Sequence, residues 1–147
     1  MRPSLESWQR FQNLSAPSRS LVVEAAAALG MTWLGLRIVG LRNWMRAVDS
    51  FLAWPVEAVR SADSALARAR AVARFQDSAA RHLFVPTNCL ERSLALCWLL
   101  KRRGIAAQLR LGARKDDGRF EAHAWVEVCG TVLNDVAAFD LSFAPFA

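Results

Sequence analysis

Three residues in the second half of the sequence are of types that together carry out acyl-transfer chemistry. They are Cys89, His123 and Asp135, separated by 34 and 12 positions. A cysteine thiolate can attack a carbonyl carbon, an imidazole can take up and return the proton, and a carboxylate can fix the tautomer of the imidazole. Each residue type also has ordinary structural roles, so the pattern around each one has to be weighed.

Cys89 stands at the predicted start of a helix. Residues 84–88 break the helical pattern, which then runs from position 89 to about position 103. Asn88 is a suitable N-cap, and Glu91, three residues on, completes a capping-box pattern. A thiol here lies near unpaired backbone N–H groups and the positive end of the helix dipole, which favour a thiolate. The alternative is an inert cysteine that begins a helix.

His123 lies in the middle of a predicted strand, residues 120–128. Alternation places His123, Trp125 and Glu127 on one face, and the small apolar residues Ala122, Ala124, Val126 and Val128 on the other. A neutral core histidine is the ordinary explanation. The alanines on both sides leave space for the close approach that a general base needs. Trp125 is expected to be a core residue, and Glu127 lies too far along the strand to contact the imidazole directly.

Asp135 falls within the next predicted strand, residues 132–136. A carboxylate in an apolar strand is costly unless it is paired, and an imidazole N–H on the neighbouring strand is a suitable partner. The alternative is a turn residue, because Asn134-Asp135 is also typical of turns.

The register of this hairpin decides whether His123 and Asp135 can meet. Directly opposite residues share a face, so the two side chains need a pairing in which the residue numbers sum to an even value. A two-residue turn at Cys129-Gly130 gives an odd sum. We therefore expect a loop of three or five residues around Gly130, or a bulge.

The remainder of the chain predicts the elements that hold these residues. Helices are expected over residues 4–13, from a cap at Ser18 or Ser20 through Trp44 or beyond, and after Pro55. Alternation predicts a strand over 105–111, a hairpin turn over 115–118 follows, and the apolar tail 139–147 is expected to pack back on the body. The fold class is α+β: N-terminal helices (residues 1–83) in the same domain as a catalytic core (84–147) with one helix on a small antiparallel sheet.

Four stretches that contain these motifs resemble one known family in their order and spacing. They are residues 88–96, 99–105, 120–127 and 133–135. The resemblance is to the lasso-peptide B2 family, the leader peptidases of lasso-peptide biosynthesis, which have a transglutaminase-like, papain-like fold. It covers about residues 84–137, and the helical half resembles that family only in size and hydrophobicity.

This resemblance implies a function and a set of partners. The family's catalytic triad carries over to Cys89, His123 and Asp135, with no metal or organic cofactor. The substrate would be the leader region of a ribosomally made precursor, delivered by a small B1-type leader-recognition protein. A separate ATP-dependent lasso cyclase would then close the ring.

Two other functions use the same features. A transglutaminase or acyltransferase would pass the acyl group to an amine with the same triad, and a non-catalytic interaction module would use only the apolar helices. A zinc site made from Cys89, Cys97, Cys129 and His123 is not expected, because the sequence lacks the CxxC and HxxxH spacings. Cys97, in a predicted apolar helix, reads as a core residue.

Composition narrows the partners and the compartment. The net charge is +6, and the 17 arginines and two lysines are scattered rather than clustered, which does not favour nucleic-acid binding. Three cysteines and a polar beginning without a signal peptide predict a reducing cytoplasm. Residues 21–41 are apolar but interrupted by Glu24 and Arg37, so a buried or partner-facing helix is favoured over membrane insertion.

Overall fold

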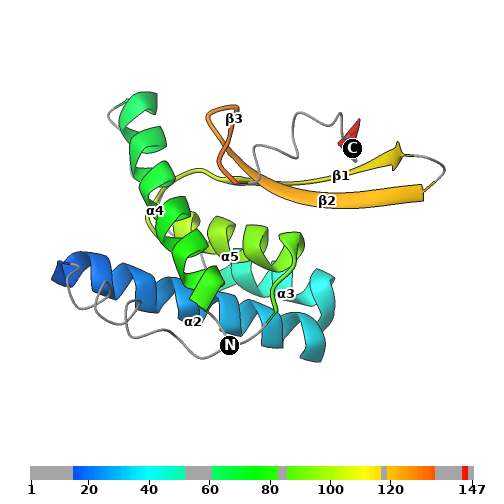
Figure 1. Cartoon of the computed structure of the whole chain (residues 1–147), viewed down its shortest axis with the longest axis horizontal. Coiled ribbons are helices and arrows are strands. Elements are labelled where there is room, and N and C mark those ends of the chain that lie inside the picture. Colours follow the sequence, from blue (N-terminus) through cyan, green and yellow to red (C-terminus); the bar gives the residue numbers. More distant parts are fainter. Residues whose placement is uncertain (1–14, 52–60, 83–85, 117–118, 135–143, 146–147) are drawn as a thin grey trace.

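Four helices precede a small antiparallel sheet in the computed structural model, which describes residues 15–51, 61–82, 86–116, 119–134 and 144–145 (Figure 1). The helices are α2 (Ala16–Ile38), α3 (Gly40–Phe51), α4 (Ala62–His82) and α5 (Cys89–Lys101). The strands are β1 (Gln108–Asp116), β2 (Arg119–Val128), β3 (Thr131–Val132) and β4 (Ala144–Pro145), in the spatial order β3-β2-β1-β4. The predicted α+β class is confirmed.

The first described helix differs at both ends from its prediction. α2 begins at Ala16, after Ser15, because Pro17 fits the first turn of a helix, so the expected cap at Ser18 or Ser20 is wrong. The helix also does not continue through Trp44. It ends at Ile38, and Gly40 adopts a φ of +77°, which is easy only for glycine and lets α3 leave in a new direction.

α3 folds back closely on α2 because of a second glycine. A Cβ atom at Gly35 would lie 2.2 Å from the ring of Trp44, so the aromatic ring occupies the space that a side chain would need. The predicted helix over 4–13 and the predicted start after Pro55 fall outside the described residues. The helix expected after Pro55 is described as α4, and its predicted apolar positions Ala69, Val72 and Ala73 are buried.

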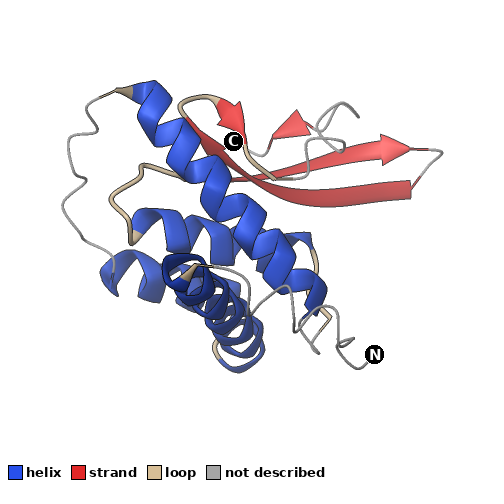
Figure 2. Cartoon of the chain, turned by 60° about the vertical axis from the view of Figure 1, so that its left-hand side comes forward, coloured by secondary structure: helices blue, strands red, loops and turns tan. Residues whose placement is uncertain are grey.

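α5 is the central element of the core. Ala95, Leu96, Leu99 and Leu100 are fully buried, in one cluster with residues of α2, α4 and β2. Figure 1 shows α5 between α2 and the sheet, and Figure 2 shows the helices gathered on one side of the sheet. The helix ends close to its predicted limit, before Gly104 with a φ of +69°.

The sheet is built around one long hairpin. β1 pairs with β2 from Gln108 opposite Glu127 to Asp116 opposite Arg119, so β1 extends beyond the predicted strand. β4 pairs with β1, which places this part of the apolar tail back on the body as expected.

α2 is long and apolar enough to cross a membrane, and 22% of its most apolar window is buried. Its buried side packs against α4 and α5, and a row of large apolar side chains on the other side is exposed: Val23, Met31, Leu34 and Ile38. The two charges that interrupt the helix both form ion pairs, Glu24 with Arg102 and Arg103, and Arg37 with Glu91.

Candidate active site

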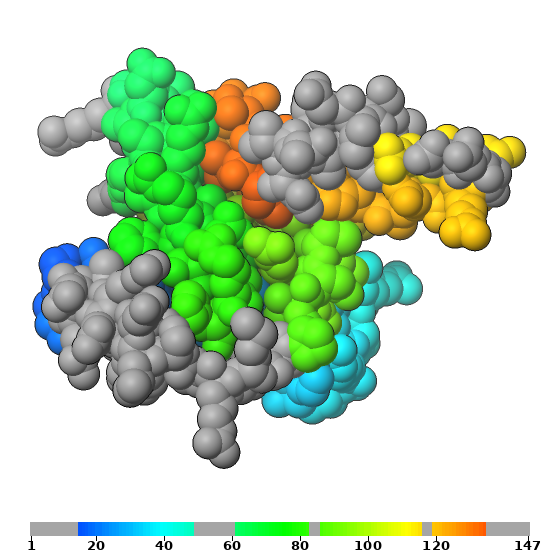
Figure 3. Space-filling model, in the orientation of Figure 1, coloured from blue at the N-terminus to red at the C-terminus, as the bar shows by residue number. Residues whose placement is uncertain are grey.

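Cys89 is the first residue of α5, and the predicted capping box is confirmed. The Asn88 side chain accepts a hydrogen bond from the Glu91 backbone N–H at 3.0 Å, and a Glu91 carboxylate oxygen accepts one from the Asn88 N–H at 2.9 Å. These reciprocal bonds fix the turn that carries the thiol. Cys89 is half-buried, and the N-terminal part of α5 reaches the surface below β2, beside α4 (Figure 3).

Glu91 also joins α5 to α2. Its second carboxylate oxygen accepts a hydrogen bond from Arg37 Nη1 at 2.8 Å, and the Glu91 side chain is only 4% exposed. The Arg37 guanidinium lies over the ring of Trp33, with 3.9 Å to the ring centroid. One carboxylate therefore caps the helix and holds it to its neighbour.

Arg92, the next residue, joins α5 to α4. Its guanidinium forms an ion pair with Asp77 at 2.6 Å, and its backbone carbonyl accepts a hydrogen bond from the side chain of Gln76. Gln76 is buried, so this bond satisfies a polar side chain in the core.

Ser93, the third residue in succession, joins α5 to the sheet. Its hydroxyl donates a hydrogen bond of 2.8 Å to the carbonyl of Ala124 on β2, and Ser93 is fully buried. Successive helix residues point about 100° apart, so residues 91, 92 and 93 reach α2, α4 and β2 in turn.

His123 lies on β2, on the face that the sequence predicted. Ala124, Val126 and Val128 are buried, and Val126 and Val128 belong to the same core cluster as the helices. His123 is half-buried, with its Nε2 atom inaccessible to solvent, and its ring stacks against Trp125 with centroids 6.2 Å apart.

The cross-strand neighbour of His123 on β1 is Gly112, so no β1 side chain lies directly opposite the imidazole.

Trp125 and Glu127 form a small network beyond His123. Trp125 is buried, and its indole N–H donates to a Glu127 carboxylate oxygen at 2.9 Å. The other oxygen of Glu127 pairs with Arg110 on β1 at 3.2 Å. Trp125 is therefore a core residue, as predicted, and Glu127 contacts Trp125 and Arg110.

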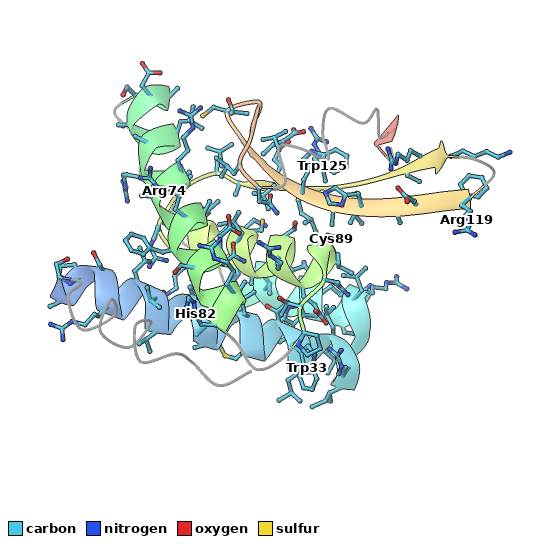
Figure 4. All side chains as sticks on the ribbon, viewed as in Figure 1. Trp33, Arg74, His82, Cys89, Arg119 and Trp125 are labelled. Atoms are coloured by element: carbon cyan, nitrogen blue, oxygen red, sulfur yellow. The ribbon has the colours of Figure 1, made fainter. Side chains whose placement is uncertain are left out.

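α5 meets β2 at the edge of the strand that faces away from β1. The backbone of Val126 bonds to Leu133 and Asn134, which follow β3, so the carbonyl of Ala124, two residues earlier, points to the same edge. Ser93 binds that carbonyl, and Cys89 lies one helical turn, about 6 Å, before Ser93. Figure 4 shows Cys89 at the end of α5, below β2. The structure thus brings the helix start of Cys89 and the strand of His123 to one edge.

The predicted loop around Gly130 is wrong. Val128 pairs with Thr131, and the connection is a two-residue turn in which Cys129 and Gly130 have φ values of +50° and +73°. Two residues with positive φ form a tight hairpin turn that suits the twist of the strands. The predicted strand 132–136 is also corrected, because β3 ends at Val132.

Asp135 lies outside the described residues, so the structure does not test its predicted place beside His123. Leu133 still donates its N–H to the carbonyl of Val126 at 3.0 Å. The N–H of Val126 then binds the side chain of Asn134, at 2.9 Å, instead of a backbone carbonyl. Among the described residues, the backbone hydrogen bonds between β2 and the segment after β3 therefore end at Leu133.

Asn134 and Ser93 are site residues that the sequence reasoning missed. The amide nitrogen of Asn134 donates to the Ser93 hydroxyl at 2.8 Å, which closes the network with Ala124 and Val126. For Ser93, the available signal was a polar residue one turn after the cysteine, directly before the apolar run 94–100.

The other thiols and histidine have structural surroundings. Cys97 is buried with its sulfur 3.7 Å from the Ala107 carbonyl, and Cys129 is exposed in its turn. His82, near the end of α4, lies 2.8 Å from the Ser78 carbonyl. In the part of the chain that the structure describes, no group of three or more His, Cys, Asp or Glu side chains is placed to hold a metal ion.

Comparison with protein-family models matches residues 33–147 to the transglutaminase-like superfamily. Searches of curated proteins and of solved structures gave no match. The matched region includes α5, the strands and all three predicted triad positions.

Proposed function

The chain belongs to the transglutaminase-like superfamily, which includes cysteine peptidases and acyltransferases, and from this we propose that it is a cysteine peptidase with the triad Cys89, His123 and Asp135. The proposed substrate is the leader region of a lasso-peptide precursor. That finer assignment is supported by the motif stretches around the three residues, whose order and spacing resemble the lasso-peptide B2 family.

In the proposed reaction, the Cys89 thiolate attacks the carbonyl carbon of the scissile bond while His123 holds the thiol proton. The imidazolium gives this proton to the leaving amine, and an acyl-enzyme remains on the sulfur. His123 then takes a proton from water, whose oxygen attacks the thioester, and the thiol is regenerated. Asp135 orients the imidazole, and the Cys89 backbone N–H is the first donor to the developing oxyanion. No cofactor enters this sequence.

The observation that supports this proposal most strongly is the bonding of Ser93. Ser93 belongs to the helix that Cys89 begins, Ala124 follows His123, and Asn134 precedes Asp135. The hydrogen bonds among them tie the three segments of the proposed triad together, although these segments are far apart in sequence. A nucleophile and its base need such fixed relative positions.

Product analysis tests the reaction. The purified chain is incubated with a synthetic precursor, and the products are identified by mass spectrometry, with and without an added primary amine. We expect a free leader and a free core peptide in both cases. A mass that corresponds to the leader joined to the amine would instead identify an acyltransferase. A precursor that stays unchanged, even when the B1-type leader-recognition protein is added, would contradict the proposal.

We further propose that a B1-type leader-recognition protein docks on α2 and presents the precursor. The exposed row of Val23, Met31, Leu34 and Ile38 offers an apolar surface, and the exposed Arg19 lies one helical turn before Val23 on the same helix. Presentation raises the effective concentration of the peptide at Cys89. The partner should therefore raise the initial rate far more at low than at saturating precursor. Identical titration curves would show that the chain recognises the leader alone.

The remaining proposals concern the cell. We propose a cytoplasmic location, because a reducing compartment would keep the three cysteines, Cys89, Cys97 and Cys129, as thiols. The ATP-dependent lasso cyclase is a proposed second partner, because it consumes the product of the cleavage. Nucleic acid is not a proposed partner.

A further inference from the structure

We infer that Ser93 and Asn134 are positioning residues that set the geometry between the start of α5, which carries Cys89, and the part of β2 that carries His123. The inference rests on the proposed function, because it concerns the same site. It follows from a single hydrogen-bonded chain: Asn134 Nδ2 donates to Ser93 Oγ, and Ser93 Oγ donates to the Ala124 carbonyl, each at 2.8 Å. Asn134 Oδ1 accepts the Val126 N–H at 2.9 Å.

The first step concerns the helix. Ser93 is fully buried and lies one turn after Cys89, on the same face of α5. Its bond to the Ala124 carbonyl fixes how far α5 is rotated and shifted along the edge of β2. A small rotation of α5 would move the thiol away from the level of His123, which immediately precedes Ala124.

The second step concerns the strand. The Asn134 side chain stands in for a backbone carbonyl that would continue the pairing with β2. The same side chain also donates its amide N–H to Ser93 Oγ, so that Asn134 holds β2 and α5 together. An alanine at this position would leave the Val126 N–H to pair with the Leu133 carbonyl and extend the regular strand.

The third step concerns the neutrality of the network. Ser93 and Asn134 use a hydroxyl, an amide and backbone groups only, and each is satisfied by a partner. The network can therefore hold the site without adding a charge that would compete with the thiolate–imidazolium pair. Gln76 makes a comparable buried bond to the Arg92 carbonyl on the α4 side of α5, so it provides a matched control.

The test measures the reactivity of Cys89 and needs no substrate. Full-length protein with Cys129→Ser, which removes the exposed thiol, is alkylated with iodoacetamide at pH 6 and pH 9, and the peptide that contains Cys89 is quantified by mass spectrometry. The ratio of the two rates reports how much thiolate is present at pH 6, whereas a change in access alters both rates equally. These variants leave the described ion pairs at the start of α5, Glu91 with Arg37 and Arg92 with Asp77, in place and change only the contacts with β2.

We expect Ser93→Ala and Asn134→Ala each to lower the ratio about tenfold, because each breaks a buried bond that aligns the pair. The double variant should lose little more than either single one, because both act through one network. Gln76→Leu should lower the melting temperature to a similar degree and leave the ratio within about twofold. Cleavage of a precursor, once established, should show a lower kcat with little change in KM.

Unchanged ratios in Ser93→Ala and Asn134→Ala, with a lower melting temperature, would overturn the inference and leave a purely structural network. If these variants do not fold, Asn134→Asp keeps the acceptor for the Val126 N–H and should give an intermediate ratio, and a wild-type ratio there would count against a role for the amide donor in aligning the pair. The proposed function fails in a different way, through a wild-type chain that leaves every precursor intact while its alkylation ratios behave as expected.

Discussion

α5 is held differently on its two sides. Toward the helices, it is bound by charged groups, Glu91 to Arg37 and Arg92 to Asp77, whose side chains are partly exposed except for that of Glu91. Toward the sheet, it is bound by the neutral hydroxyl of Ser93, which is fully buried. The same short stretch of helix thus combines two kinds of attachment.

The difference separates stability from geometry. Ion pairs that water can reach tolerate small displacements and contribute modestly to folding. A buried neutral hydrogen bond depends steeply on distance and angle, so it fixes position more tightly than its net energy suggests. We therefore expect changes on the sheet side to act on activity, and changes on the helix side to act on stability.

The largest effects on this view come from the chemical groups themselves. Cys89→Ala and His123→Ala should each reduce leader cleavage by about 10⁴-fold or more, because covalent catalysis needs both nucleophile and base. Both residues are half-buried, so the melting temperature should change little. Cleavage rates and thermal melts of the same preparations check both expectations. Normal turnover by Cys89→Ala would contradict the role of Cys89 as the nucleophile.

Asp135→Ala should cause the next largest loss of cleavage activity. The nucleophile and base remain, and only the orientation of the imidazole is lost, so cleavage should be about tenfold to hundredfold faster than in Cys89→Ala. Initial rates at saturating precursor, measured on the three variants together, give the ranking. An Asp135→Ala protein as active as the wild type would assign the third role to another residue.

On the helix side, Glu91→Ala should act mainly on stability. It removes half of the capping box and the ion pair to Arg37, for a loss of about 2 kcal/mol and a melting temperature lower by about 4–8 °C. Glu91→Gln keeps an acceptor for the Asn88 N–H and loses only the ion pair. Its melting temperature should therefore fall by less than half as much as that of Glu91→Ala. Equal losses in the two variants would assign the stabilisation to the charge.

The smallest effect should come from the ion pair between Arg92 and Asp77. Both side chains are more than a third exposed, so Asp77→Asn should lower the free energy of unfolding by less than about 1 kcal/mol. Chemical denaturation at low and high salt measures this, and the difference from wild type should shrink as salt rises. A loss as large as that of Glu91→Ala would break the contrast between the two attachments.

Local patterns predicted much of this structure. The capping box of Asn88 and Glu91 defines the start of α5 to the residue, and alternation places His123 and Ala124 on their observed faces. These features depend on neighbours in the sequence, so a single chain is enough to infer them.

The features that could not be predicted depend on where a break falls or on contacts between distant residues. Gly40 ends α2 because α3 must fold back against Gly35, which no local pattern reveals. The turn at Cys129 was misjudged because its length was deduced from the need of His123 and Asp135 to share a face, whereas the structure has a two-residue turn with Cys129 at positive φ. Ser93 and Asn134 looked ordinary, because their bonds join distant segments. Ser93 binds Ala124, 31 residues later, and Asn134, 41 residues later.

The consecutive attachments of residues 91, 92 and 93 have a consequence for the order in which the protein acquires its reactivity. Their partners lie 54 residues earlier, 15 residues earlier and 31 residues later in the chain. During synthesis, α5 can dock on α2 and α4 as soon as it emerges, but its sheet-side contact has to wait for β2. A nascent or partly unfolded chain would then hold its thiol unaligned, so that the nucleophile becomes active only in a chain that has finished folding.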